Sequence, residues 1–151
     1  MNQPKYQLES DRKLMLFEFT SVGRKGRVKK IVQYVEANLK DLYNLGFGDK
    51  DEKTGEINDT IITNNGDSQK VLATVASTVY AFTDKHPNAL IYAKGSNTAR
   101  TRLYRMGITN NLLEIKKDFY VFGLKDDQWH EFRKNLEYEA FLIIDLLRNS
   151  G

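Results

Sequence analysis

Apolar and polar residues alternate along the first part of the chain, as they do in strands that expose one face to solvent. Between residues 14 and 22, Met15, Phe17 and Phe19 fall on one face. The same period recurs beyond it, so the pattern predicts a β meander with strands at residues 14–22, 28–36, 42–47 and 56–63. The polar residues 48–55 form the predicted hairpin loop between the last two strands.

The spacing changes to that of a helix after Gly66. Asp67 or Ser68 is the predicted N-cap, and Pro87 ends the helix because proline disfavours helix in the residue before it. Between them, apolar residues recur every three or four positions, at Val71, Leu72, Val75, Val79 and Phe82. The pattern therefore predicts one amphipathic helix over this segment.

The next segment combines a strand and a second helix. Residues 89–93 are apolar and predict a short buried strand. Gly95-Ser96-Asn97 then opens a helix that is expected to reach about Met106, with Gly107 as its C-cap.

Two further strands, at residues 119–122 and 138–144, are expected to pair antiparallel. Trp129 lies between them and is expected to cover one end of the core. The order β-β-β-β-α-β-α-β-β predicts a single α+β domain of residues 1–151, with a twisted, mostly antiparallel sheet and two main helices.

Composition narrows the class of protein. The 151 residues are 40% hydrophobic and 28% charged, which is typical of one globular domain. The chain has no cysteine, so disulfides and thiolate metal sites are excluded, and a cytoplasmic location is expected. No apolar run approaches the roughly 20 residues that span a bilayer, so we expect no membrane partner.

Metal ligands are not spaced as known metal sites require. Asp49 and Asp51 resemble the start of a calcium loop, but that loop needs glycine at its sixth position, where Thr54 stands. His86 and His130 are the only histidines and match no ligand spacing. We therefore expect no bound metal.

The net charge of +3 is mild, but basic residues gather in two clusters. The first follows the first predicted strand and comprises Arg24, Lys25, Arg27, Lys29 and Lys30. These side chains could follow nucleic-acid phosphates. In the simpler interpretation, they keep an exposed strand from pairing at its edge.

The second cluster lies at a strand-to-helix junction, where free backbone N–H groups favour an anion. Lys94, Ser96 and Arg100 could hold a phosphate there, and Arg102 adds charge on a face that it shares with Arg105. The alternative is a capped amphipathic helix whose arginines pair with surface carboxylates.

Part of this helix resembles a known motif. Asn97-x-x-Arg100-x-x-Leu103-Tyr104-x-x-Gly107 is similar to the N-x-x-A-x-x-L-Y-x-x-x-G stretch of the GCN5-related N-acetyltransferases, and the predicted order of elements is similar too. The resemblance implies acetyl-CoA as the candidate cofactor, with Asn97 among its contacts. It also implies that Tyr104 is the general acid that protonates the departing thiolate.

The same resemblance implies a pyrophosphate site at the start of the first helix. The backbone N–H groups there would hold coenzyme A, and they belong to Gly66, Asp67, Ser68 and Gln69. The Asp67 carboxylate adds a negative charge beside this site. We therefore expect weak or absent coenzyme binding, and a gain in affinity from Asp67→Gly.

Two departures from the N-acetyltransferase pattern bear on activity. The chain between Tyr6 and Leu14 is too short for the two helices that shape the acceptor site in that family. The fourth predicted strand offers only Glu56 and Asp59 as candidate general bases.

A second resemblance is to a family of short, uncharacterised bacterial proteins. It rests on K-G-S-x-x-x-R-x-R-L-Y, from Lys94 to Tyr104, and on the later N-x-x-Y-E-A-F-L. Three hypotheses stay open: a divergent acyltransferase or a binder of acyl-CoA or another phosphate ligand, a non-catalytic interaction protein, and, less favoured, a nucleic-acid or nucleotide-phosphate binder.

Overall fold

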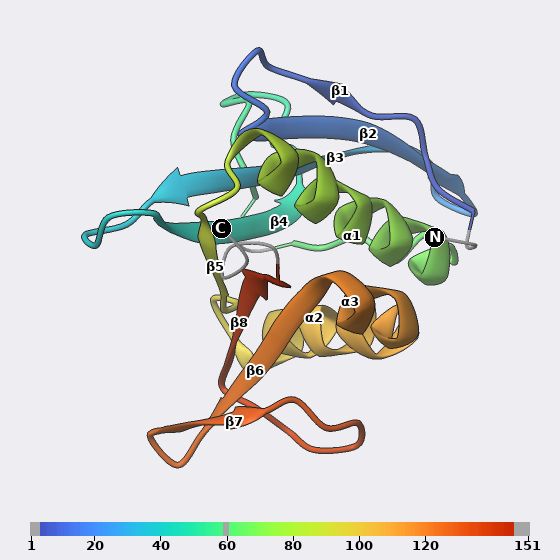
Figure 1. Ribbon diagram of the computed structural model, residues 1–151. Helices are drawn as coiled ribbons and strands as arrows, with labels where there is room; N and C mark the ends of the chain where they lie inside the picture. Colours follow the sequence, from blue (N-terminus) through green and yellow to red (C-terminus); the bar gives the residue numbers. More distant parts are fainter. Residues whose placement is uncertain (1–3, 59–60, 147–151) are drawn as a thin grey trace.

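The computed structural model describes residues 4–58 and 61–146 and shows one eight-stranded sheet with three helices (Figure 1). The helices are α1 (Ser68–Lys85), α2 (Thr98–Asn110) and α3 (Leu112–Asp118). In sequence order, the strands are β1 (Glu9–Ser10), β2 (Leu16–Gly23), β3 (Gly26–Glu36), β4 (Leu42–Asp49), β5 (Leu90–Ala93), β6 (Phe119–Lys125), β7 (Gln128–Glu131) and β8 (Ala140–Asp145). The expected mixed fold with a mostly antiparallel sheet is confirmed.

The strands lie side by side in the order β1-β2-β3-β4-β5-β8-β6-β7. Among the described residues, β4 and β5 form the one parallel pair, from Leu42 opposite Leu90 to Leu45 opposite Ala93. Beyond Ala93 the chain leaves the sheet, whereas β4 continues to Asp49 and pairs there with β3 alone. The two strands therefore part, and we call the space between them the wedge.

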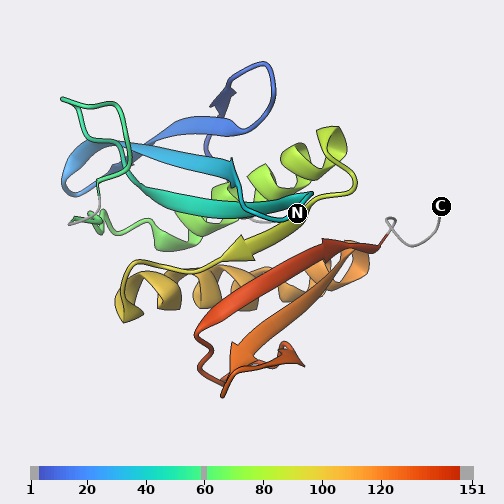
Figure 2. The same cartoon turned by 90° about the vertical axis from the view of Figure 1, so that its left-hand side faces the viewer.

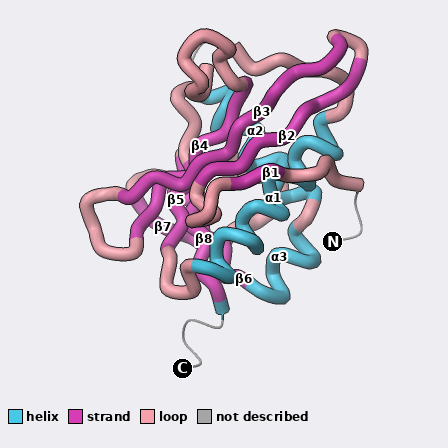
Figure 3. Tube along the Cα trace, turned by 90° about the horizontal axis from the view of Figure 1, so that it is seen from above, coloured by secondary structure: helices cyan, strands magenta, loops and turns pink. Residues whose placement is uncertain are grey.

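The helices gather on one side of the sheet (Figure 2 and Figure 3). Tyr34 of β3 stacks on Phe82 of α1, with ring centroids 4.0 Å apart, and Tyr43 of β4 meets the same ring edge-on. Because side chains alternate along a strand, Gln33 on β3 faces the opposite side of the sheet. Burial of this aromatic cluster fixes α1 across the first half of the sheet.

The expected pairing of the last two strands is confirmed, because β6 and β8 run antiparallel from Phe119 opposite Asp145 to Leu124 opposite Ala140. The expected position of Trp129 is wrong. This side chain lies on β7 and is 42% exposed, with its ring edge-on to Tyr92. It therefore belongs to the edge of the sheet and does not close the core.

The predicted strand at residues 56–63 is also absent from the part that the structure describes. Only an isolated bridge between Lys50 and Ile57 forms, and residues 59–60 lie outside the described residues, Asp59 among them. Side chains take the backbone carbonyls of this segment, since Arg100 binds Asn58 O and Lys30 binds Thr63 O. The described residues 57–58 and 61–63 therefore do not extend the sheet as a strand, and we call them the crossing segment.

The second helix does not end at Gly107. It continues to Asn110, and a third helix, α3, begins at Leu112. A Cβ on Gly107 would lie 3.5 Å from the Leu72 side chain, so this glycine lies at the contact between α2 and α1. It is an interior position of α2 that faces α1, and it does not cap the helix. No helix in the described part of the chain has the length and apolarity to span a membrane.

Candidate functional site

A cavity of about 450 Å³ lies where α1 and α2 both begin. Asp67 and Ser68 line it from the start of α1, and Asn97 and Arg100 line it from the start of α2. We call it the interhelical cavity. Three of the predicted cofactor residues, Asp67, Ser68 and Asn97, thus share one wall although α1 separates them in the sequence. Gly66 and Gln69 adjoin that wall in the chain but do not line the cavity.

Asp67 occupies the N-cap position of α1, but its side chain forms no capping hydrogen bond. The predicted N-cap position is therefore confirmed, but the side chain does not cap the helix. Its carboxylate instead accepts hydrogen bonds from the Tyr6 and Ser21 hydroxyls. Burial alone would raise the pKa of Asp67, but these two bonds and the nearby charge of Lys30 hold that pKa below its usual range. The carboxylate is therefore ionised and held toward β2.

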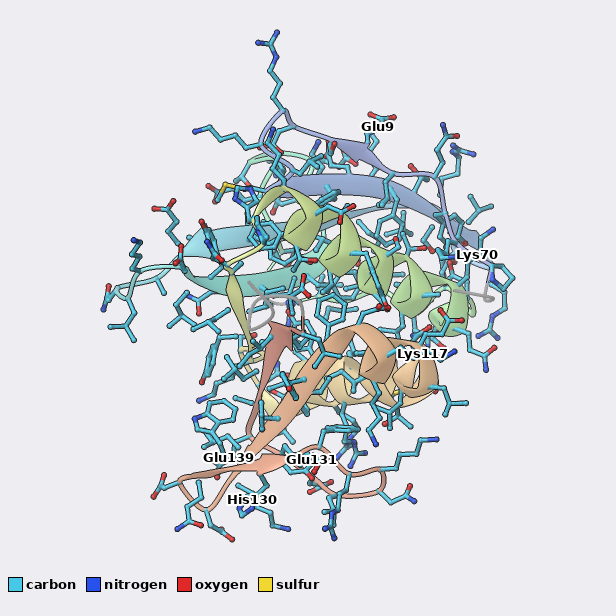
Figure 4. All side chains as sticks on the ribbon, in the orientation of Figure 1. Glu9, Lys70, Lys117, His130, Glu131 and Glu139 are labelled. Atoms are coloured by element: carbon cyan, nitrogen blue, oxygen red, sulfur yellow. The ribbon has the colours of Figure 1, made fainter. Side chains whose placement is uncertain are left out.

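Tyr6 connects this carboxylate to the first two turns of α1. Its backbone N–H donates to Thr74 Oγ1 at 2.8 Å, and the Lys70 ammonium lies 4.1 Å from its ring centroid. Figure 4 labels Lys70 at the N-terminal end of α1. The N-terminal segment is thus fastened to the helix that borders the cavity.

The turn before α1 is held from the side of the β2–β3 hairpin. Asn65 is 2% exposed, and its side chain donates to Gly26 O and accepts from the Lys25 backbone N–H. Gly66 follows with a φ of +78°, a left-handed conformation that glycine adopts without strain. These contacts fix the direction in which α1 begins.

The start of α2 is capped in the usual way. Asn97 Oδ1 accepts a hydrogen bond of 2.9 Å from the Arg100 backbone N–H. Asn97 therefore has a structural role whatever it contacts in the cavity.

A second, smaller cavity of about 200 Å³ occupies the wedge between β4 and β5. We call it the wedge cavity. Lys94 and Ser96 line it from the end of β5, Tyr104 and Arg100 from α2, and Ile57 from the crossing segment. It shares a wall with the interhelical cavity, formed by Phe47, Ile62, Arg100 and Leu103. The two cavities therefore adjoin along one face of α2.

Tyr104 lies in the wedge beside the last residues of the parallel pair. Its hydroxyl donates to Leu45 O at 3.2 Å. Burial raises the pKa of Tyr104 to about 12, although the Phe47 backbone hydrogen bond and the charge of Arg100 both act to lower it. The phenol is therefore protonated at neutral pH and can donate a proton.

Two buried cations hold the crossing segment, residues 57–58 and 61–63. Arg100 is 8% exposed, and its Nη2 donates to Asn58 O at 2.6 Å and to Ile61 O at 3.4 Å. Lys30 is 1% exposed, pairs with the Asp49 carboxylate and donates to Thr63 O at 2.9 Å. The other Asp49 oxygen accepts from the Thr63 backbone N–H, so both oxygens of this carboxylate are bound within the protein.

The residues predicted to bind an anion line two cavities, and Lys94 and Ser96 line both of them. Lys94, Ser96 and Arg100 line the wedge cavity together. Arg102 points instead to a cavity of about 570 Å³ on another side of α2, where it lies 3.6 Å from a Glu137 oxygen. Arg105 lines that cavity too and donates to Leu136 O.

Acidic side chains partly neutralise the positive charge of this larger cavity. Glu139 lines it as well, and Figure 4 shows Glu139 near β7, in the same region as Glu131 and His130. Three His, Asp or Glu side chains close enough to hold a metal are not found among the described residues.

Sequence reasoning did not single out Lys30, Asp49 or Tyr6 for this site. For Lys30 a signal was present, because it alternates with Val32 and Tyr34 on the buried face of β3. The remaining members of the first basic cluster are exposed, although β3 lies inside the sheet between β2 and β4. The cluster thus separates into four solvated charges and one buried one.

A family model covers almost the whole of this chain, from residue 2 to residue 146. The chain belongs to a family of unknown function, DUF6934. No curated protein and no solved structure matches it. The expected membership in an uncharacterised family is thus confirmed, whereas the likeness to N-acetyltransferases finds no support in these comparisons.

Proposed function

We propose that the protein binds an acyl-CoA-type thioester, with the phosphates in the interhelical cavity and the thioester end in the wedge. One observation carries the proposal: two helix N-termini and two buried cations border a cavity that shares a wall with the cavity of Tyr104. Its volume of about 450 Å³ is ordinary for a small-molecule site.

Electrostatics favours an anion in the interhelical cavity. A helix N-terminus presents free N–H groups and a partial positive charge. One such terminus stabilises a nearby anion by roughly 0.3–1 kcal/mol. Asp67 leaves the first-turn N–H groups of α1 without a side-chain cap. Arg100 adds a positive charge to the lining, whereas the charge of Lys30, which also lines the cavity, is paired with Asp49. A phosphate group matches this combination.

Asp67 opposes the same ligand. Like charges about 4 Å apart cost roughly 1 kcal/mol in water and about 4 kcal/mol near a protein surface. Because the carboxylate already accepts two hydroxyl hydrogen bonds, it is held at a fixed position in the wall. We therefore expect weak binding by the wild-type protein.

The proposal concerns binding more than catalysis. Tyr104 could protonate a departing thiolate, as the resemblance to N-acetyltransferases implies. Acyl transfer would also need a base for the acceptor, and Asp67 is the one carboxylate among the described residues that line either cavity. Its hydrogen bonds to Tyr6 and Ser21 make it a poor base.

Calorimetric titration with acetyl-CoA at low salt tests the proposal. We expect Asp67→Asn, which keeps the shape of the side chain and removes its charge, to bind at least tenfold more tightly than wild type. Ser68→Glu should weaken binding, since it adds a carboxylate to the cavity wall. Gln69→Glu is the matched control, because it makes a similar change one residue away and outside the wall.

Two part-ligands show which half of the coenzyme binds. Adenosine 3′,5′-bisphosphate tests the phosphate contacts, and pantetheine tests the wedge. If neither wild type nor Asp67→Asn binds acetyl-CoA at millimolar concentration, the proposal is wrong and a non-catalytic interaction protein becomes the better hypothesis.

A nucleic-acid function has no comparable support. Arg102 faces Glu137, and Arg105 donates to a backbone carbonyl, so both are partly engaged within the protein. A duplex titrated at two salt concentrations should therefore show little binding.

A further inference from the structure

The wedge cavity has an unusual lining for a site that would receive a neutral acetyl group. Lys94 and Arg100 both line it, with Ser96 and Gln33 as further polar side chains. No carboxylate lines it among the described residues. A confined space with two positive charges and no negative one favours an anionic occupant.

Arg100 has hydrogen-bonding capacity left over. A guanidinium carries five N–H donors, and both side-chain hydrogen bonds of Arg100 leave from Nη2. Nη1 and Nε bond to none of the described residues, although the side chain is 8% exposed. The described part of the chain holds no buried side-chain nitrogen or oxygen without a partner, so these N–H groups reach solvent and can donate to a group that enters the wedge.

The position of these donors relates them to Tyr104. Arg100 Nη1 lies 3.3 Å from the place that a Cβ on Gly48 would occupy, along the open edge of β4. Tyr104 contacts the same strand at Leu45. The two residues are four positions apart on α2, so their side chains lie on one helix face about one turn, roughly 5 Å, from each other.

We propose that the thioester bound in the wedge carries a second acidic group, so that its acyl chain is a short dicarboxylic one such as malonyl or succinyl. This inference rests on the proposed binding of an acyl-CoA-type ligand. The thioester would lie at Tyr104, and the terminal carboxylate would accept hydrogen bonds from Arg100.

The chemistry of the side chains matches this ligand. A guanidinium can bind a carboxylate through two parallel hydrogen bonds, which is stronger and more directional than a single ammonium contact. Lys94 lines the same cavity and adds a second charge. The volume of about 200 Å³ restricts the chain to a few carbons.

Competitive titration of the wild-type protein with four thioesters tests the inference. Acetyl-CoA and butyryl-CoA carry neutral chains, whereas malonyl-CoA and succinyl-CoA carry a terminal carboxylate. We expect at least one of the acidic thioesters to bind at least tenfold more tightly than butyryl-CoA. If all four bind alike, or the neutral ones bind better, the inference is wrong and the proposed function stands. If none binds, the proposed function itself fails, and this inference with it.

Variants locate the preference. Arg100→Lys keeps the charge and removes the two-pronged donor, so it should abolish most of the preference for the acidic chain while acetyl-CoA affinity changes less. Lys94→Gln is an exposed substitution that should reduce the preference severalfold without affecting folding. Arg102→Gln is the control, because Arg102 lies outside the wedge lining, and it should leave the preference unchanged. A preference that survives both Arg100→Lys and Lys94→Gln would contradict the assignment.

Discussion

Lys30 and Arg100 are both buried, and both line the interhelical cavity. Both also donate to carbonyls of the crossing segment. They differ in whether a carboxylate neutralises the positive charge. Lys30 is neutralised by Asp49, whose second oxygen is bound to Thr63. Among the described residues, the Arg100 guanidinium donates only to carbonyl oxygens, those of Asn58 and Ile61. Burial alone therefore does not mark a candidate ligand-binding charge, because a buried cation can be neutralised by a carboxylate within the fold, as Lys30 is, and the proposed ligand site relies on Arg100, which is not.

The largest expected effect comes from breaking the paired charge. Lys30→Met leaves Asp49 buried and without its cation, so the free energy of unfolding should fall by about 3–5 kcal/mol. Urea denaturation measures this change. Lys50→Met is the matched control, because Lys50 also pairs with a carboxylate, that of Glu18, but in a more exposed position.

The comparison would break if Lys30→Met and Lys50→Met shifted the urea midpoint equally. The double variant Lys30→Met/Asp49→Leu adds a further check. Replacing a buried pair by apolar residues often restores stability, so this variant should recover much of the loss.

Removing the unpaired cation should cost less. Arg100→Gln strands no carboxylate and leaves two carbonyls without a charged donor, so we expect a loss of about 1.5–3 kcal/mol. The same urea experiment measures it. A loss as large as that of Lys30→Met would mean that Arg100 is primarily structural, against the contrast drawn above.

The cap that positions Arg100 should contribute less again. Asn97→Ala removes the acceptor of the Arg100 backbone N–H and should destabilise the protein by about 1 kcal/mol. Asn97→Ser retains a capping oxygen and should stay close to wild type. Thermal denaturation of the two variants compares them, and equal melting temperatures would show that the cap contributes nothing.

The smallest effect concerns acid. The pKa of Asp67 is lowered in the folded protein, so the unfolded chain binds more protons as the pH falls through about 4, the ordinary range of a carboxyl. Stability from this group is present above that range and is lost below it. Urea midpoints of wild type and Asp67→Asn between pH 6 and pH 3 should therefore converge on acidification. A constant difference would contradict the lowered pKa.

The sequence predicted those parts of the fold in which the spacing of apolar residues follows the period of a strand or a helix. Strict alternation identified β2 and β3, and helical spacing identified α1. The strand predicted at residues 56–63 was wrong. The composition of this segment is β-prone, but side chains of distant elements, Lys30 and Arg100, bind its carbonyls at Thr63 and Asn58. Local pattern contains no information on such partners.

The candidate site was predicted in a similar way. Resemblance to a motif brought Tyr104 and the turn at Gly66 into one hypothesis. In the structure, Tyr104 lines the wedge cavity, and Asp67, which follows Gly66, lines the adjoining interhelical cavity. The role of Asp67 could not be predicted, because its partners Tyr6 and Ser21 lie on segments far from it in sequence. Its position before a helix suggested a cap, which tertiary contacts override.

The short parallel junction of β4 and β5 has a consequence for the order of folding. The hairpins of β2, β3 and β4 close through short turns, whereas β5 can join β4 only after the crossing segment and α1 are in place. Contacts that close long loops form late, because chain entropy opposes them until other contacts are made. A ligand in the wedge would span this late-forming seam, and it would therefore slow unfolding more than it speeds folding.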